Sequence, residues 1–169
     1  MIQLSYYFAR DIHQKRKIMK LIKLTKGMFA KIDDEDYESV SQHSWHYSCQ
    51  GYACSRINNK IVSMHNFIMK PPVGFETDHI NKYVNDRCDN RKQNLRICTR
   101  SQNIANTAHQ KQNKTGYKGV TKVGNIWRAK VGFQRKCIHI GYFDTPEEAA
   151  SAYDIKIKEL FGEFAVTNF

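Results

Sequence analysis

The sequence of 169 residues predicts an α+β fold with many short strands and one long helix near its C-terminal end. Apolar and polar residues alternate over 22–25 and 29–32, which is typical of half-buried strands. Three further β-rich stretches lie between residues 117 and 143, separated by short polar turns. After residue 144 the apolar residues recur at helical spacing. Since 41% of the residues are apolar, the chain has enough of them to form a core.

The N-terminal part is expected to be rich in strands. Residues 1–20 show no clear period and are expected to be an extension of the fold. The two alternating stretches flank a turn at Lys26-Gly27, and an acidic helical turn is expected over 33–40. A short apolar stretch over 65–70 ends at Pro71-Pro72. Between these, we expect strands over 45–48, 52–56 and 60–64, with turns at Gln50-Gly51 and Asn58-Asn59.

The middle of the chain predicts two strands followed by a helix. A strand over 75–80 opens into a polar loop, 81–90, and a second strand covers 95–98. Thr99 or Ser101 can cap a helix that runs to about residue 109. Residues 106–115 are polar and basic, which indicates a linker or the frayed end of that helix.

The C-terminal part predicts a three-stranded meander packed against a helix. The strands are expected over 117–121, 126–133 and 136–143. Asp144 or Thr145 can cap the helix, with Pro146 in its first turn and two glutamates at its positive end. Gly162 is expected to end it. The apolar stripe of this helix consists of Ala149, Ala152, Tyr153, Ile157 and Leu160.

The charge of the chain indicates a polyanionic partner. Lys and Arg number 27 against 16 Asp and Glu, so the formal net charge is +11. Residues 90–143 contain twelve Lys or Arg and no acidic residue. A solvated surface normally mixes both signs, and repulsion among these cations would destabilise the fold unless phosphates neutralise it. Nucleic acid is therefore the expected partner.

Several classes of protein are disfavoured by the sequence. No apolar run reaches the eighteen residues of a membrane-spanning helix, and residues 1–20 lack the pattern of a secretory signal. The five cysteines form no C-x-x-C pair, and their odd number favours a reduced, intracellular compartment. His43, His46, Cys49 and Cys54 could be drawn as a zinc site, but their spacing is not that of a zinc knuckle and the surrounding pattern favours a packed sheet.

A group of polar residues in the middle of the chain has the chemistry of a metal-dependent hydrolase. Asp78 and the amide oxygen of Asn103 would suffice as protein ligands for Mg²⁺ beside a phosphate. His79, neutral near pH 7, could take a proton from an attacking water, and Asn94 could accept the other ring N–H and fix the tautomer. Since neighbours on a strand point to opposite faces, the strand must end or twist at His79.

These residues stand in motifs that resemble the HNH endonucleases, in the branch found in homing and phage enzymes. The motifs are Met64–Met69, Glu76–Asn81, Asp89–Arg96 and Ser101–Asn103, and the resemblance covers roughly residues 24–109. It implies a ββα-metal centre that hydrolyses DNA with one divalent metal, Mg²⁺ in the first place and Mn²⁺ as the alternative. By position, His79 matches the general base, Asn94 the residue that orients it, and Asp78 and Asn103 the metal ligands.

Two departures from that family stand out. The loop over 81–89 is longer than the family's short turn, which the fold can tolerate but which could change substrate fit. Asn66 stands where an Arg usually follows the early histidine of the motif, so we expect His65 to pack or to make a structural hydrogen bond.

Residues 116–169 are similar to the Apetala-type DNA-binding domain of plant ethylene-response factors, through Gly116–Val120, Trp127–Val131, Ile140–Ala150 and Ala152–Asp154. The resemblance implies that a three-stranded sheet packed on one helix lies in the major groove. Independently, Arg128 and Lys130 share one face of a strand. Thr121, Val123 and Gly132 stand where the plant factors carry arginines, which predicts fewer guanine contacts. The expected DNA contacts are Lys118, Lys122, Arg128, Lys130, Lys136 and His139, with Arg91, Arg96 and Arg100 from the first half.

Together these features predict a modular DNA endonuclease of a homing or mobile-element type. Its expected parts are an extension (1–20), an HNH domain (21–109, with the ββα-metal core at about 64–109), a basic linker (110–115) and an Apetala-type domain (116–169). The expected partner is double-stranded DNA, bound by a monomer without a membrane or a small-molecule cofactor. The alternatives are a non-catalytic DNA-binding regulator with a degenerate HNH domain, and a protein that binds or cuts RNA.

Overall fold

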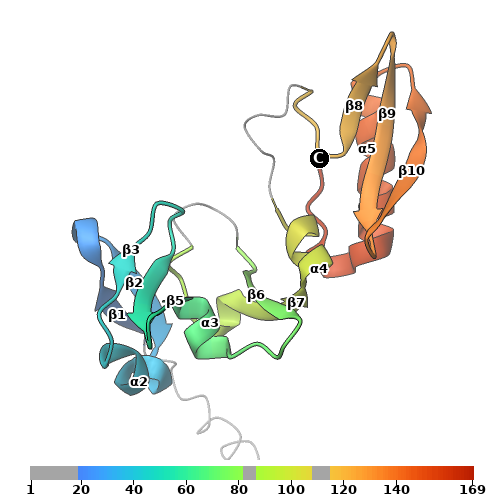
Figure 1. The fold of residues 1–169 in the computed structure, drawn as a ribbon. Coiled ribbons are helices and arrows are strands. Elements are labelled where there is room, and N and C mark those ends of the chain that lie inside the picture. Colours follow the sequence, from blue (N-terminus) through green and yellow to red (C-terminus); the bar gives the residue numbers. More distant parts are fainter. Residues whose placement is uncertain (1–18, 82–86, 108–114) are drawn as a thin grey trace, which may run out of the picture. The chain divides into compact units, whose positions relative to one another are not determined.

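The computed structural model describes residues 19–81, 87–107 and 115–169. The expected extension up to residue 18, most of the loop over 81–89 and most of the basic linker lie outside the described residues. The chain divides into two compact units (Figure 1). In the described part, the first unit comprises residues 19–70 and 87–95, and the second comprises 71–81 and 96–169. The strand–strand–helix of the expected nuclease thus falls in the same unit as the C-terminal sheet and helix.

The first unit is built from two small antiparallel sheets and short helices. Strands β1 (Met19–Lys23) and β2 (Phe29–Asp33) form a hairpin, and 3₁₀ turn Asp34–Asp36 leads into helix α2 (Tyr37–Ser41). The second sheet has the order β3-β4-β5 and precedes helix α3 (Met64–Met69). Its strands are β3 (His46–Tyr47), β4 (Ala53–Ile57) and β5 (Lys60–Ser63). The first strand begins at Met19, three residues earlier than predicted and within the stretch expected to be an extension, while the other strands and the acidic helical turn agree with the sequence prediction to within one residue.

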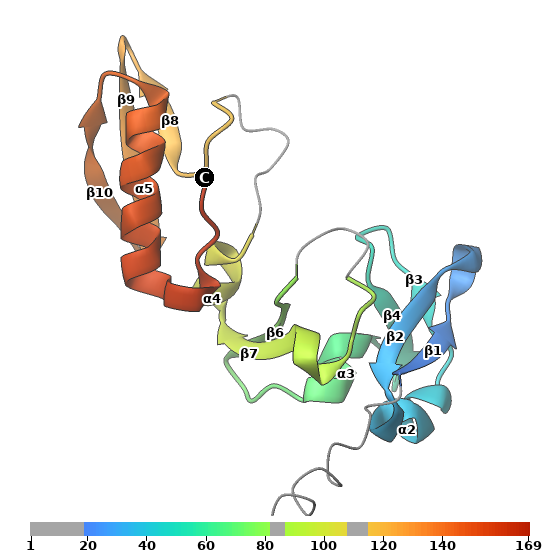
Figure 2. The same cartoon turned by 180° about the vertical axis from the view of Figure 1, so that it is seen from behind.

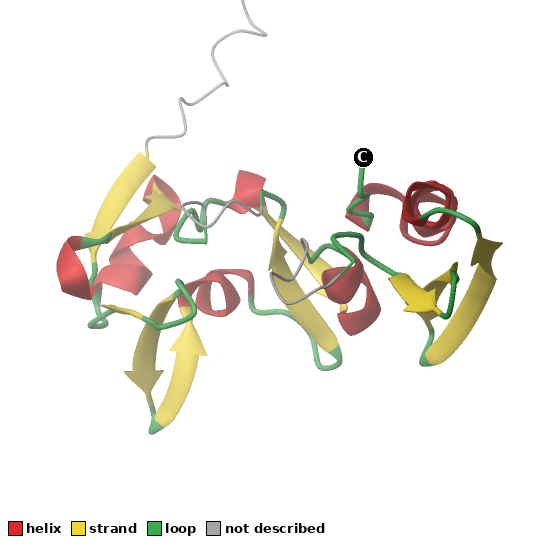
Figure 3. Cartoon of the chain, turned by 90° about the horizontal axis from the view of Figure 1, so that it is seen from above, coloured by secondary structure: helices red, strands yellow, loops and turns green. Residues whose placement is uncertain are grey.

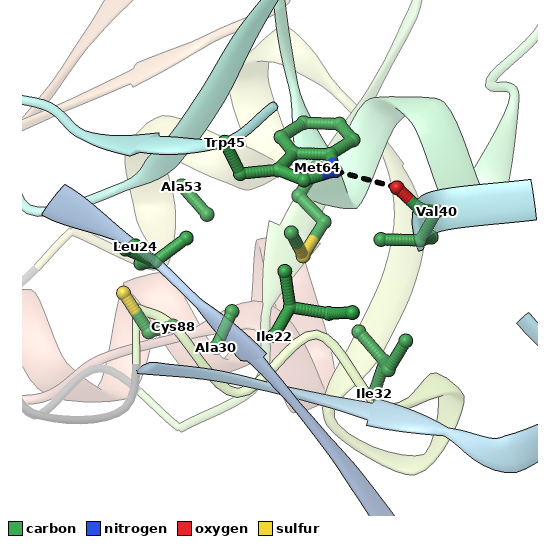
Figure 4. Close-up of a cluster of buried hydrophobic side chains, with 9 residues drawn as sticks. All are labelled: Ile22, Leu24, Ala30, Ile32, Val40, Trp45, Ala53, Met64 and Cys88. Carbon is green, nitrogen blue, oxygen red and sulfur yellow. Dashed lines mark hydrogen bonds between the residues drawn. The ribbon is translucent and has the colours of Figure 1, made fainter. Parts of the chain in front are cut away.

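The core of the first unit lies between the hairpin, α2 and α3 (Figure 4). Ile32, Val40 and Met64 are fully buried, and Trp45 donates a hydrogen bond from Nε1 to the carbonyl of Val40 at 2.8 Å. The segment before the 3₁₀ turn Lys92–Asn94 runs beside β2, since Lys31 exchanges backbone hydrogen bonds with residues 88 and 90. This return of the chain closes the core from the side of the hairpin.

The second unit begins with two strands and a helix. Strand β6 (Phe75–His79) pairs with β7 (Leu95–Thr99), and helix α4 (Arg100–Ala105) follows at once. Thr99 caps α4, and Gln102 completes a capping box with it, so the prediction of Thr99 as a cap is confirmed. The helix ends at Ala105, about four residues before the predicted end at residue 109. Residue 109 itself lies outside the described residues.

The rest of the second unit is a three-stranded antiparallel sheet with one long helix on it. Strands β8 (Val120–Val123), β9 (Ile126–Phe133) and β10 (Lys136–Phe143) form a meander. Helix α5 (Pro146–Phe161) runs along one face of this sheet (Figures 2 and 3). It begins with a capping box of Thr145 and Glu148, and Gly162 ends it. The meander and both ends of the helix agree with the sequence prediction, except that β8 begins at Val120, three residues later than predicted, because residues 117–119 form a turn.

The sheet and α5 enclose a second hydrophobic core. Ala129 and Val131 from β9 pack with Tyr153 and Ile157 from α5, and all four are at most 5% exposed. Ala105 from α4 belongs to the same cluster. The core of the C-terminal sheet therefore extends to the helix that follows β7. Within the described residues, no helix has both the length and the apolar character that crossing a bilayer requires.

Gly119 permits the close packing of the chain before β8 against α5. A Cβ atom at this position would lie 2.1 Å from two ring atoms of Tyr153 and 2.9 Å from the carbonyl oxygen of Lys130. Its φ of +75° also belongs to the region that side chains disfavour. Lys130 donates its N–H to the carbonyl of Gly119 at 2.9 Å, so the backbone has little room to retreat.

We therefore expect Gly119→Ala to lower the free energy of unfolding by about 1–3 kcal/mol, through steric overlap and an unfavourable φ. Gly124→Ala is the matched control, because Gly124 also has a positive φ (+61°) but no atom within 4 Å of its Cβ position. Urea unfolding followed by circular dichroism would measure both variants. Equal destabilisation of the two would show that backbone strain alone, and not the contact with Tyr153, decides the effect.

Candidate active site and DNA-binding face

Strand β6 and helix α4 bring two carboxylates against two carboxamides. Glu76 and Asp78 are two residues apart on β6, so their side chains lie on the same face of the strand. Asn103 and Asn106 are three residues apart and lie on one side of α4 and its C-cap. Asn103 Nδ2 donates to Glu76 Oε2 at 2.6 Å, and Asn106 Nδ2 donates to Asp78 Oδ2 at 2.6 Å. These paired contacts fix the strand and the helix relative to each other.

Asp78 is a buried carboxylate with one oxygen engaged. Its side chain is 8% exposed, and Oδ2 accepts from Arg96 Nε at 3.1 Å as well as from Asn106. Among the described residues, no hydrogen bond is made to Oδ1. Two donors on one oxygen fix the plane of the carboxylate and leave the other oxygen for a ligand.

Asn103 is held in a similar way. Its amide nitrogen donates to Glu76, and its side-chain oxygen accepts no hydrogen bond from the described residues. Carboxylate and carboxamide oxygens are the donors that Mg²⁺ and other hard cations prefer. The donor set of Asp78 and Asn103 therefore fits a divalent cation.

His79 is the last residue of β6, so the strand ends where the sequence requires it to end. His79 is 6% exposed, and its carbonyl accepts a second hydrogen bond from Asn106 Nδ2 at 3.1 Å. Asn106 thus binds both members of the Asp78-His79 pair. The sequence analysis did not select Asn106, although its spacing of three residues from Asn103 was a usable signal.

Asn94 and Arg91 belong to the first unit. Asn94 is 9% exposed and donates from Nδ2 to the carbonyl of Asp89 at 2.9 Å, so its side chain is anchored to the segment that precedes β7. Burial alone would raise the pKa of Asp89, but the hydrogen bonds and charge of Arg91 outweigh it and hold that pKa below its ordinary value. Arg91, an expected DNA contact, is thus paired inside the protein.

Two other expected DNA contacts also bind the protein itself. The side chain of Arg96 is 12% exposed and reaches Asp78. Lys118 donates from Nζ to the carbonyls of Ala105 and Thr107 at 2.6 and 2.9 Å, and burial lowers its pKa to about 8. By contrast, the side chain of Arg100 is 80% exposed, although it pairs with Glu76.

The register of the C-terminal sheet divides the remaining expected contacts between its two faces. Arg128 lies opposite Thr121 and Tyr142, and Lys130 lies opposite His139, all on the face away from α5. Lys122 lies opposite Trp127, and Lys136 opposite Phe133. Both aromatic partners pack against the α5 core, which places these two lysines at the ends of the inner face.

Arg128 has the clearest unsatisfied group on the outer face. Its Nε is buried and has no hydrogen-bond partner in the described part of the protein. A buried N–H without a partner is costly unless a ligand supplies an acceptor. We call the set of Arg128, Lys130, His139 and Tyr142 the outer sheet face. It offers two cations, an imidazole and a phenol to a partner.

The early histidine and the drawn zinc ligands have structural partners. His65 Nε2 lies 3.0 Å from Ser63 Oγ, and its ring meets that of Tyr52 edge-on, so the expectation of packing or a structural hydrogen bond is confirmed. The ring of His43 packs against Trp45 and Phe67. No metal-binding cluster that contains the four drawn zinc ligands occurs among the described residues.

One acidic cluster does occur, formed by Asp33, Glu35 and Asp36 in the first unit. Lys92 occupies the position of its counter-ion: Nζ lies 2.6 Å from Glu35 Oε1 and 3.2 Å from Asp36 Oδ1, and its backbone N–H donates to Asp33. The hydrogen bond to Glu35 raises the pKa of Lys92 most. The single positive charge of Lys92 thus offsets part of the charge of the three carboxylates.

Comparison with known proteins identifies two kinds of relatives of this chain. No model of a protein family matches it. The chain is 33% identical over 150 residues to an uncharacterised HNH endonuclease of Acanthamoeba polyphaga mimivirus, which covers 85% of this chain and 76% of that protein.

The other relatives are plant transcription regulators. An AP2/ERF and B3 domain-containing transcription repressor of Arabidopsis thaliana is 39% identical over 70 residues, which are 41% of this chain and 19% of the repressor. An AP2-like ethylene-responsive transcription factor of the same plant is 46% identical over 57 residues, 31% of this chain and 16% of the factor. The chain thus spans less than a fifth of each of these two regulators.

Cysteine alkylation tests the burial of Cys98, which lies on β7 next to β6. Burial raises the pKa of Cys98 to about 11, helped by the charges of Asp78 and Glu76. Only the thiolate reacts, so at pH 8 about one Cys98 in a thousand is reactive. We expect iodoacetamide at pH 8 to modify the exposed Cys49 and Cys137 first, and Cys98 only when the pH approaches 11 or the protein unfolds. Mass spectrometry of the digest would contradict this if Cys98 reacted as fast as Cys137.

Proposed function

The chain belongs to the HNH endonuclease family, and we propose that it is a metal-dependent DNA endonuclease whose catalytic centre lies on β6 and α4. The observation that carries this proposal is the state of Asp78 and Asn103. Each is anchored through one atom and has one oxygen without a hydrogen bond among the described residues, and Asp78 directly precedes His79 on β6. Mg²⁺ is the proposed metal, and Mn²⁺ would fit the same donors.

Each residue of the centre has one proposed task. Asp78 and Asn103 hold the divalent metal, which when bound offsets the negative charge that develops on the phosphate and the leaving oxygen. His79 takes a proton from the attacking water and must be neutral to do so. Asn94 orients the imidazole through its amide oxygen. Asn106 acts on the centre indirectly, by fixing the carboxylate of Asp78 and the end of β6.

The outer sheet face is the proposed DNA-binding surface of the C-terminal module. The relatives of this part of the chain are transcription regulators, and the module carries no acidic residue before Asp144. Arg128 and Lys130 point away from α5 and would contact DNA directly. Thr121 lies in the same outward-facing row as Arg128. With few arginines in these rows, phosphate contacts would contribute more to binding than base readout.

The two functions in one chain support a homing or mobile-element role. An endonuclease joined to a DNA-binding module remains at high effective concentration on its site, without further contacts. We propose that the nuclease function resides in residues 21–109 and the DNA-anchoring function in residues 116–169.

Loss of a proposed catalytic residue should prevent cleavage without weakening DNA binding. Asp78→Ala and His79→Ala should each lower Mg²⁺-dependent cleavage of supercoiled plasmid by at least about 100-fold, because they remove a metal ligand and the base. DNA affinity measured in EDTA should stay within about twofold of the wild type. Lys60→Ala, at the exposed first position of β5, is the control and should cut normally.

Wild-type protein that binds duplex DNA but cuts neither plasmid nor genomic fragments would favour the regulator with a degenerate HNH domain. Preferential binding or cutting of structured RNA in competition with duplex DNA would favour the RNA alternative.

Removal of the two cations of the outer sheet face should weaken DNA binding. The double variant Arg128→Gln/Lys130→Gln should weaken DNA binding and reduce the slope of log K against log salt by about 2, since two phosphate contacts are lost. Lys156→Gln/Lys158→Gln on α5 removes the same charge elsewhere on the module and should change the slope little. Equal losses in both double variants would mean that net charge alone, and not this face, determines binding.

A further inference from the structure

Arg96 joins the carboxylate of Asp78 to the C-terminal segment of the chain. Its Nε donates to Asp78 Oδ2 at 3.1 Å. On the other side, its Nη1 donates to the carbonyl of Glu163 at 3.2 Å and lies 3.7 Å from the carboxylate of the same residue. The guanidinium carbon lies 3.9 Å from the centre of the Phe164 ring. Glu163 and Phe164 belong to the 3₁₀ turn Gly162–Phe164, directly after α5.

These contacts immobilise the Arg96 side chain. A planar guanidinium can stack on an aromatic ring while its N–H groups donate hydrogen bonds within its own plane, which an ammonium cannot do. With a side-chain exposure of 12%, Arg96 has little contact with water. The position of its Nε, and with it the orientation of Asp78, therefore depends on residues 163 and 164.

A second set of contacts joins the end of α4 to the C-terminal module. Lys118 donates to the carbonyls of Ala105 and Thr107, and Val166 donates its N–H to the carbonyl of Ala105 at 3.3 Å. Ala105 is 3% exposed in the core beneath the C-terminal sheet. Helix α4 carries Asn103, and its C-cap is Asn106. The residues that anchor both carboxylates of β6 thus lie on an element that the C-terminal module covers.

The charge of Arg96 and its geometry act on a bound cation in opposite directions. A positive group about 3 Å from a metal ligand repels a cation, which would weaken metal binding. Fixing one oxygen of the carboxylate so that the other faces the metal would strengthen it, and groups that orient metal ligands typically change affinity or activity 10–100-fold. The sign of the effect of removing Arg96 therefore separates the two roles.

We propose that Arg96 is a positioning residue for the metal ligand Asp78, held in place by Glu163 and Phe164, so that the C-terminal segment is part of the catalytic centre as well as part of the DNA anchor. This inference rests on the proposed function, which assigns Asp78 to the metal. It assigns to the C-terminal module a task that a tethered DNA-binding domain would not have.

The test measures Mn²⁺ binding directly, in full-length protein that cannot cut. His79→Ala protein bound to duplex DNA is titrated with Mn²⁺, and the free ion is followed by electron paramagnetic resonance. The same complex with Asp78→Ala added gives the background from DNA and the remaining surface. In the His79→Ala protein, Arg96→Met and Phe164→Leu should each weaken the Asp78-dependent binding by about tenfold. Lys156→Met, which removes an exposed ion pair on α5, should not change it.

Two conservative variants separate positioning from folding. Phe164→Tyr keeps the stacking ring and should retain the parental affinity. Arg96→Lys keeps the charge but lacks the planar fork, so it should remain impaired. Thermal unfolding by circular dichroism confirms that each variant is folded. In the protein with His79 restored, Arg96→Met and Phe164→Leu should cut DNA more slowly than the wild type at low metal concentration. Part of the cutting rate should return at high metal concentration.

The outcomes separate the two proposals. Mn²⁺ affinity that is unchanged or higher in Arg96→Met would overturn the positioning role, because repulsion would then dominate. A loss in Arg96→Met with normal affinity in Phe164→Leu would overturn the dependence on the C-terminal segment. If the parental complex shows no Asp78-dependent Mn²⁺ binding and the wild type does not cut DNA, the proposed function itself fails, and this inference with it.

Discussion

The second unit depends on the neutralisation of one buried carboxylate. An ionised Asp with 8% side-chain exposure is unfavourable unless hydrogen bonds and opposite charge compensate for the lost water. Arg96 and Asn106 both supply this compensation at Oδ2. Arg96 comes from β7 and Asn106 follows α4, so the same contacts that make the carboxylate tolerable also assemble the strand–strand–helix. Its structural requirement and its proposed ligand role are met by different oxygens.

The distribution of charge along the sequence has a structural explanation beyond DNA binding. Residues 90–143 contain no acidic residue, yet several of their cations pair with acids from other parts of the chain. Arg91 binds Asp89, Lys92 binds the acidic cluster, and Arg96 binds Asp78. The carboxylates simply lie before the stretch rather than within it. Part of the positive charge is therefore internal. Among the described residues, the exposed cations of the stretch include Lys130 of the outer sheet face and also Lys122, Arg135 and Lys136.

The sequence could predict those features of the site that depend on local patterns. Local rules gave Thr99 and Thr145 as one of two candidate caps each, the end of β6 to within one residue of His79, and the opposite orientation of Arg128 and Ala129 on β9. These depend on periodicity or on neighbours in sequence. The ligand assignments of Asp78 and Asn103 came from a resemblance, and the structure adds that their donor atoms fit a cation.

The same reasoning could not separate the cations that are proposed to bind DNA from the cations that stabilise the fold. Arg96 and Lys118 have the same residue types and the same basic neighbourhood as Arg128 and Lys130. The partner of Arg96 at residue 163 is 67 positions away, and the carbonyls that Lys118 binds belong to a helix end whose position the sequence had put further along. Only tertiary contacts decide the role of such a residue, because a guanidinium or ammonium group satisfies a carboxylate, a carbonyl or a phosphate equally well.

The contacts of Arg96 and Lys118 also bear on why the two activities share one chain. A binding module on a free tether raises only the local concentration of a nuclease, and it can be removed without loss of the catalytic geometry. Here the helix that carries Asn103 contributes Ala105 to the core beneath the C-terminal sheet, and the turn after α5 holds the arginine that binds Asp78. The sheet proposed to bind DNA and the proposed metal ligands are therefore connected by a short series of packed groups. In such an arrangement, the module proposed to anchor the DNA also contributes to the geometry of the proposed metal centre.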